Sequence, residues 1–282
     1  MPCHWVSARF CERLSLVWTN WDRGKLHGVQ DLTLLTGSSQ VHASREDGGV
    51  PVPAFIDLNA DLGEGVTDDA GLLDVVTSAN LACGFHAGDA ATMRSVCERA
   101  AELGVAVGAQ VSYLDREGFG RRPMEVEASV LIAWIAEQVH TLTDIAAAAG
   151  TRVSYLKPHG ALYNRVIDDA AQAEAVIAGS ADLPLLTLPI GELRARALAI
   201  GREVRTEGFP DRGSRPDGRL LPRTEPGALV DDPQQIAANA VELARAGIDS
   251  VCVHGDSPGA VEVAIRVRRA LLDAGHVLRP LP

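Results

Sequence analysis

The sequence predicts an α/β protein, a (β/α)7-type barrel that forms a single domain with an N-terminal extension. From Pro53 onward, short apolar runs alternate with longer amphipathic stretches, which is typical of repeated βα units and a parallel sheet. Each of the seven predicted strands is followed by a helical stretch. No glycine-rich phosphate loop follows the first strand, which disfavours the open sheet of a dinucleotide-binding fold.

The elements are predicted in a regular order along the chain. The expected strands are Ala54–Ala60, Thr77–Cys83, Ala106–Gln110, Val153–Lys157, Leu185–Leu188, Glu203–Thr206 and Ser250–His254. The expected helices are Asp69–Val75, Ala90–Leu103, Glu125–Ala149, Asp168–Ser180, Gly191–Ile200, Pro233–Ala246 and Pro258–Ala274. Several of these helices should end at a glycine C-cap, at Gly104, Gly150, Gly201, Gly247 or Gly275.

Two segments of different character make up the chain. Residues 1–52 hold three of the four tryptophans but show no sustained period of 3.6 or 2, so we expect a poorly ordered extension. Residues 53–282 are expected to form the barrel domain. With 46% hydrophobic residues, the chain of 282 residues is long enough to bury one large core.

Charge and composition exclude several classes of function. The formal charge of −11 and the lack of a block of lysines or arginines argue against nucleic acid or an anionic membrane as a partner. No apolar stretch approaches the roughly 20 residues that span a bilayer, and no signal peptide is evident, so we expect a cytoplasmic protein. The five cysteines form no CxxC pair, which fits a reducing compartment.

The first predicted strand ends in alternating polar residues. Asp57, Asn59 and Asp61 should point to one side, into the barrel, because side chains alternate along a strand. Buried carboxylates are costly unless they bind a cation, share a proton or are fully hydrogen-bonded, so we favour a functional role over a structural one. Glu64, in the following loop, is expected to be solvated.

The second strand leads into a turn that contains two glycines. His86 and Asp89 should project into the mouth of the barrel, where the carboxyl ends of parallel strands build the active site. Asp89 has an alternative role as the N-cap of the next helix. Cys83 is expected to be a small buried residue rather than a nucleophile.

The fourth and last strands also end in polar groups. Lys157 and His159 are placed where they could polarise a carbonyl or phosphoryl oxygen, with Tyr163 and Asn164 shortly after them. The last predicted strand ends at His254, which Gly255 and Asp256 follow.

Two loops carry arginines that could bind a substrate carboxylate through a bidentate fork. These are Arg121 in GFGRR and Arg212 in FPDRG. Ordinary surface ion pairs would explain both arginines equally well.

Seven motifs together resemble the LamB/YcsF family from about Phe55 to the C-terminus. They are IDLNADLGEG (56–65), SANLACGFHAGD (78–89), GFGRR (118–122), KPHGALYN (157–164), FPDRG (209–213), LPR (221–223) and CVHGD (252–256). The resemblance implies a barrel of the glycoside hydrolase/deacetylase-like type. It also implies the A subunit of ATP-hydrolysing 5-oxoprolinase, which cleaves 5-oxo-L-proline to L-glutamate while ATP becomes ADP and phosphate.

The same resemblance implies cofactors, partners and roles. ATP is expected as co-substrate, with Mg²⁺, and subunits B and C, which resemble urea-amidolyase components, are expected as partners. The chain has no GxxxxGK[ST] loop, so a partner could supply part of the ATP site. We expect catalysis by Asp57, Asp61, His86, Lys157, His159 and Asp256. We expect substrate binding by Asn59, Asp89, Tyr163, Asn164, Arg121, Arg212 and His254.

One departure from the family pattern leaves alternatives open. Gln110 and Val111 stand where the family typically shows histidine and proline, and a carboxamide neither titrates nor binds metal well. One alternative is a deacetylase-like hydrolase whose divalent metal is held by Asp57, Asp61 and His86. Another is a substrate-binding subunit without catalysis.

Overall fold

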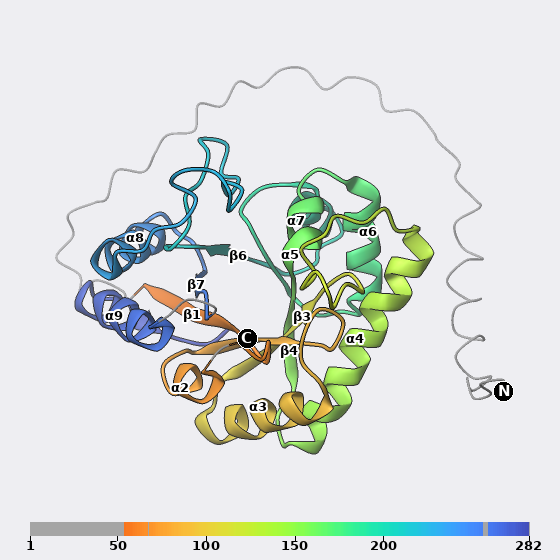
Figure 1. Cartoon of the computed structure of the whole chain (residues 1–282), viewed down its shortest axis with the longest axis horizontal. Helices are drawn as coiled ribbons and strands as arrows, with labels where there is room; N and C mark the ends of the chain where they lie inside the picture. The colour runs from red at the N-terminus through yellow and green to blue at the C-terminus, as the bar shows by residue number, and fades with distance from the viewer. Residues whose placement is uncertain (1–53, 67, 256–258, 282) are drawn as a thin grey trace. The chain divides into compact units, whose positions relative to one another are not determined.

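The structure, a computed structural model, describes residues 54–66, 68–255 and 259–281 (Figure 1). The expected extension, residues 1–52, lies outside them. Seven parallel strands close into a ring in sequence order, because β1 pairs with both β2 and β7. They are β1 (Phe55–Leu62), β2 (Ser78–Ala82), β3 (Ala106–Val111), β4 (Val153–Pro158), β5 (Leu185–Thr187), β6 (Val204–Gly208) and β7 (Ser250–Val253). The predicted (β/α)7 barrel is confirmed.

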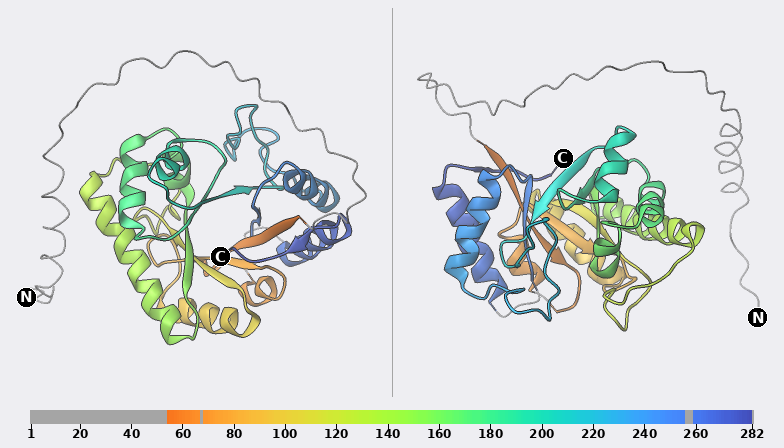
Figure 2. Two further views of the ribbon diagram at one scale, coloured as in Figure 1. Left: turned by 180° about the vertical axis from the view of Figure 1, so that it is seen from behind. Right: turned by 90° about the horizontal axis from the view of Figure 1, so that it is seen from above.

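The helices surround the ring of strands (Figures 1 and 2). They are α2 (Asp69–Leu73), α3 (Ala90–Leu103), α4 (Ala128–Ala148), α5 (Gly160–Arg165), α6 (Ala170–Gly179), α7 (Glu192–Ala199), α8 (Pro233–Arg245) and α9 (Ala260–Asp273). In the described part of the chain, no helix has the length and apolar character needed to cross a membrane.

Helix α3 illustrates how the sequence specifies these elements. The Asp89 side chain accepts a hydrogen bond from the Thr92 amide and caps the first turn. Its buried residues, Met93, Val96, Cys97 and Ala100, recur at a helical spacing and pack on the strands. The helix ends at Gly104, whose positive φ of 70° suits glycine.

Two short elements were not predicted from the sequence. Helix α5 has 6 residues, and strand β8 (Val277–Leu278) has 2, so neither is long enough to show a periodic pattern. Strand β8 pairs with β1 at Phe55 and Ile56, before β1 reaches its partners in the ring.

The barrel interior is polar along β1. Asn59 contacts Ser250 of β7 and Asn80 of β2, and Tyr155 of β4 reaches Asn80 as well. Leu58 and Ala60, between the polar positions, belong to the apolar core under the helices. The predicted inward orientation of Asp57, Asn59 and Asp61 is therefore confirmed, and all three side chains are buried.

Candidate functional site

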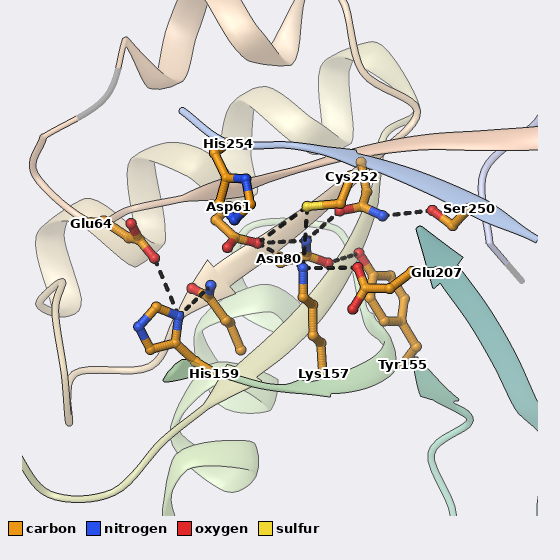
Figure 3. Close-up of polar contacts among 12 residues, drawn as sticks. Asp61, Glu64, Asn80, Tyr155, Lys157, His159, Glu207, Ser250, Cys252 and His254 are labelled. Atoms are coloured by element: carbon orange, nitrogen blue, oxygen red, sulfur yellow. Dashed lines mark hydrogen bonds and ion pairs between the residues drawn. The ribbon is translucent and has the colours of Figure 1, made fainter. Parts of the chain in front are cut away.

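A chain of hydrogen bonds runs through the barrel interior (Figure 3). Ser250 donates from its hydroxyl to Asp57, and Asn59 Nδ2 donates to Ser250 Oγ over 2.6 Å. Asn80 Nδ2 then donates to Asn59 Oδ1 over 2.6 Å and to Asp61 Oδ1 over 2.8 Å. The polar groups of β1 are thus linked from the deep end of the barrel to its mouth.

Asp57 lies at the deep end of this chain. Its carboxylate accepts hydrogen bonds from Thr77 Oγ1 (2.7 Å), Ser78 Oγ (2.6 Å) and Ser250. Burial raises the pKa of Asp57 to about 6, against the lowering effect of these hydroxyl donors. Asp57 is therefore fully engaged by neighbouring strands, and it does not line the cavity at the mouth.

Lys157 is the centre of the charged group at the mouth. Its Nζ lies 3.1 Å from Asp61 Oδ1, 2.9 Å from Glu207 Oε2 and 3.3 Å from Cys252 Sγ, so strands β1, β4, β6 and β7 meet at one ammonium group. Burial alone would lower the pKa of Lys157, but Asp61 and the other negative groups raise it well above its usual value. The lysine is therefore charged.

The two carboxyl groups beside Lys157 differ in their acidity. Burial favours the neutral form of Asp61, but the attraction of Lys157 outweighs it and lowers the pKa. For Glu207, burial dominates and raises the pKa despite the same lysine. Asp61 is therefore an ionised carboxylate at the cavity floor, and Glu207 holds its proton more readily.

A second group joins His86, His159 and Glu64. The two imidazole rings are stacked, with centroids 3.9 Å apart and planes inclined by 12°. Glu64 Oε1 lies 3.6 Å from His86 Nε2 and 3.7 Å from His159 Nδ1. Burial, followed by the neighbouring His86, lowers the pKa of His159 well below its usual value, so this imidazole is neutral.

The hydrogen bonds of His159 define its tautomer. Its Nε2 lies 3.0 Å from the carbonyl oxygen of Phe119, which can only accept, so Nε2 carries the proton. Its Nδ1 lies 3.0 Å from Gln110 Nε2 and accepts from that amide. Gln110 therefore holds a neutral His159 in one orientation.

His254 forms a third group with Asp211. Its Nδ1 lies 2.7 Å from Asp211 Oδ2, and its ring stacks on Phe209. Burial would lower the pKa of His254, but Asp211 raises it, with a further contribution from Asp61. The imidazolium form is therefore stabilised beside the cavity.

These groups border one cavity of about 730 Å³. Asp61, Lys157, His159 and His254 lie at its floor, and Tyr163 and Asn164 also line it. The remaining lining is rich in arginine: Arg121, Arg212, Arg215, Arg219 and Arg223. In a chain of net charge −11, this concentration of positive charge favours an anionic ligand.

Several expected site residues converge at this cavity. Asp61, Lys157 and His159 line it, as expected, with His254 from β7, and the buried His86 lies behind them, stacked on His159. Arg121, Arg212, Tyr163 and Asn164 line the same cavity. Arg212 also holds its own loop, because Nη2 donates to Leu221 O over 2.7 Å. Asp256 lies outside the described residues.

Besides the buried His86, three expected residues do not line the cavity. Asp57 and Asn59 bond neighbouring strands below it. Asp89 is exposed, and its side chain caps α3 instead. The expected metal set of Asp57, Asp61 and His86 is not assembled, because Asp57 lies deep in the barrel and Asp61 Oδ1 is taken by Lys157 and Asn80.

Other residues behave differently from expectation or were missed. Glu64, which we expected in solvent, is buried beside the two histidines. Glu207 was missed because it lies just after the weakly patterned strand predicted at Glu203–Thr206, although a charged residue two positions before the FPDRG motif was an available signal. Cys83 is buried as expected, and burial raises the pKa of its thiol.

Comparisons with known proteins agree on one family. The model of the LamB/YcsF family matches residues 56–282. The A subunit of 5-oxoprolinase from Streptomyces avermitilis is 54% identical over 243 residues, covering 78% of this chain and 97% of the relative. The relative of the same name from Paracidovorax citrulli is 48% identical over 247 residues, covering 80% and 98%. A solved lactam utilization protein from Thermus thermophilus has 36% identity and a TM-score of 0.75, covering 79% of this chain and 98% of that chain.

Proposed function

Because this chain belongs to the LamB/YcsF family, we propose that it is the A subunit of an ATP-dependent 5-oxoprolinase, which opens the lactam of 5-oxo-L-proline to L-glutamate. The relatives that carry this name are matched over nearly their whole length. One structural observation carries the proposal: a charged lysine and an ionised aspartate lie at the floor of an arginine-lined cavity.

The substrate fits the charge of this cavity. 5-oxo-L-proline has one carboxylate, which an arginine fork such as that of Arg121 can bind through two parallel hydrogen bonds. The lactam itself is a stable amide, so its opening requires an activated carbonyl and a protonated nitrogen leaving group. The 730 Å³ cavity is larger than this small molecule needs, which leaves room for a phosphoryl group among the other arginines.

Asp61 and His254 are suited to opposite proton transfers. The lowered pKa of Asp61 keeps it ionised, the form that can accept a proton from the attacking water, and at the same time makes it a weak base that passes the proton on. The pKa of His254 is raised, so it is ready to donate a proton to the lactam nitrogen as the carbon–nitrogen bond breaks. Such a divergence of two neighbouring pKa values is how paired acids and bases divide their roles. Lys157 holds Asp61 ionised and in place.

ATP is the proposed co-substrate, with Mg²⁺ accompanying its phosphates. Transfer of the γ-phosphoryl group to the lactam oxygen would break its bond to ADP and make the carbonyl carbon electrophilic toward water. The chain has no P-loop sequence, so we propose that subunits B and C complete the nucleotide site in a cytoplasmic complex. The arginines of the cavity would then hold the transferred phosphoryl group until, after the carbon–nitrogen bond has broken, a second water releases it as inorganic phosphate and leaves L-glutamate.

Reconstitution tests the proposal. The purified chain, its candidate partner subunits and the combined complex are each assayed for glutamate and ADP formed from 5-oxo-L-proline, ATP and Mg²⁺. We expect the complex to produce both in equal amounts and the chain alone to produce neither. Full turnover by the chain alone would contradict the division of the nucleotide site. A complex that hydrolyses ATP without opening the lactam would contradict the assignment of 5-oxo-L-proline as the substrate.

A further inference from the structure

Glu64, His86 and His159 form a cluster that the proposed reaction does not use. All three side chains are buried, and one ligand atom from each lies within 4.8 Å of the others. We propose that these three residues bind one divalent transition-metal ion of the zinc type. This resident ion is separate from the Mg²⁺ that accompanies ATP, and the site does not depend on the proposed reaction.

The spacing of the ligand atoms suits a small ion. In a tetrahedral zinc site with bonds of about 2.0–2.1 Å, neighbouring ligand atoms are roughly 3.3 Å apart. Glu64 Oε1 lies 3.6 Å from His86 Nε2 and 3.7 Å from His159 Nδ1. These two separations need to shorten by only a few tenths of an ångström. The third, between the two histidines, is within 4.8 Å, and because the rings are stacked with planes inclined by 12°, one ring must rotate before both lone pairs point at the same ion.

The cluster also contains buried polar atoms that lack hydrogen bonds. Within the described ranges, neither ring nitrogen of His86 has a hydrogen-bond partner, and neither has Glu64 Oε1. His86 is 1% exposed, so solvent does not satisfy these nitrogens. Leaving buried polar groups unpaired is unfavourable, and native proteins explain such atoms by a water, an ion or a functional strain. A metal ion would satisfy Glu64 Oε1 and His86 Nε2 at once.

His159 is oriented as a metal ligand. Its Nε2–H donates to the Phe119 carbonyl, so Nδ1 is the unprotonated nitrogen, and its lone pair would bind an ion in place of the hydrogen bond from Gln110. Metal-binding histidines commonly donate their other ring N–H to a carbonyl or carboxylate in this way. The Gln110 amide now donates to Nδ1, and its Oε1 has no partner among the described residues. A half-turn of that amide would direct Oε1 at the ion as a weak fourth ligand.

The ligand chemistry selects the class of ion. Two imidazoles and one carboxylate suit zinc, cobalt, nickel or iron better than Mg²⁺, which prefers oxygen ligands and retains water. Glu64 and His159 line the 730 Å³ cavity, so a bound ion would be reachable from it. Asp61 is not required, because Lys157 already compensates its charge.

Metal binding to the purified, tag-free full chain tests the site without partners or substrate. The protein is stripped with a chelator and dialysed against Zn²⁺, and bound zinc is counted by elemental analysis. Co²⁺ is used in parallel because its visible absorption reports a histidine-containing coordination shell. We expect one ion per chain. We expect Glu64→Gln and His86→Gln to weaken affinity by at least about a hundredfold, more than the loss of an outer-shell partner.

A surface pair provides the matched control. His140 and Asp144 lie 3.5 Å apart on α4 and are exposed, so His140→Gln removes an imidazole beside a carboxylate without touching the cluster. We expect this variant to bind zinc as the wild type does. Circular dichroism checks folding, and the isosteric Glu64→Gln decides the result if His86→Gln does not fold. The proposal is overturned if wild-type protein binds no ion, or if Glu64→Gln binds zinc as tightly as wild type.

Discussion

Lys157 Nζ lies 2.9 Å from Glu207 Oε2 inside the barrel, and both side chains are almost completely buried. Lys157 is also the only lysine after residue 53, so no other ammonium group of the barrel can replace it. This pair, extended by Asp61, brings together residues from three strands whose sequence motifs are far apart. Its charge balance is the basis of the first prediction.

Lys157→Met should strongly destabilise the barrel. Removing one partner of a buried ion pair leaves uncompensated charge and typically costs about 3–5 kcal/mol. We expect the free energy of unfolding in urea to fall by that order. The double variant Lys157→Met/Glu207→Gln should recover part of the loss, since it removes one stranded carboxyl group. If the single and double variants have equal free energies of unfolding, the loss of stability in Lys157→Met does not come from an unpaired Glu207.

Asp61→Asn should lower lactam-opening turnover at least about a hundredfold in the reconstituted complex, because the amide cannot accept a proton. The melting temperature should also fall, since the amide keeps the Asn80 contact but takes one carboxylate away from the buried Lys157, so turnover is compared at a temperature where circular dichroism shows both proteins folded. Asp89→Asn is the control: asparagine caps a helix as well as aspartate does, so turnover should stay near wild type. Loss of turnover in Asp89→Asn would restore that residue to the site.

Asp57 should make the protein less stable as the pH rises. Its pKa is 3.8 without the fold and about 6 in it, so the folded state keeps a proton that the unfolded state releases between these values. The free energy of unfolding should therefore fall as the pH rises from about 4 to 6, by roughly 3 kcal/mol for this group. Asp57→Asn should flatten that slope in urea titrations. An unchanged slope would remove Asp57 as its source.

Asp211→Asn should lower the pKa of His254. In the wild type, Asp211 raises this pKa above its unfolded value of 6.5, so the pair stabilises the protein fully below that value. The contribution is lost as the pH rises through the folded pKa. NMR titration of the His254 ring should show the decrease, and the activity of the complex should decline at a lower pH than in the wild type. An unshifted ring titration would contradict the pairing.

Gln110→His should raise turnover or metal affinity. It places a second imidazole beside His159, where Gln110 now donates an amide hydrogen bond over 3.0 Å. One acid/base group can contribute about 10²–10⁴ to a rate. The complex is assayed with Gln110→His, and with Gln110→Met as a control that removes the hydrogen bond without adding an imidazole. If Gln110→His changes neither rate nor zinc binding, position 110 only orients His159.

The sequence by itself determined the repeated βα units and the side of β1 that carries the polar residues. Both follow from local periodicity: strands alternate with a period of 2, and helices bury residues at a period of 3.6. The signals for the helix ends also lie in the local sequence, as the N-cap Asp89 and the C-cap Gly104 show for α3. The motif resemblance added the family and the functional expectation, which composition and spacing did not contain.

Only the tertiary structure decided which polar residues share the site. Asp57 and Asp61 point to the same side, but four residues along a strand separate them by about 13 Å, so one lies deep in the barrel and the other at its mouth. Glu64 is buried because the loop after β1 packs against His86 and His159. Glu207 contacts Lys157 because β4 and β6 lie on either side of β5 in the ring. Depth and cross-barrel contact depend on register and closure, which join distant segments and leave no periodic signal in either one.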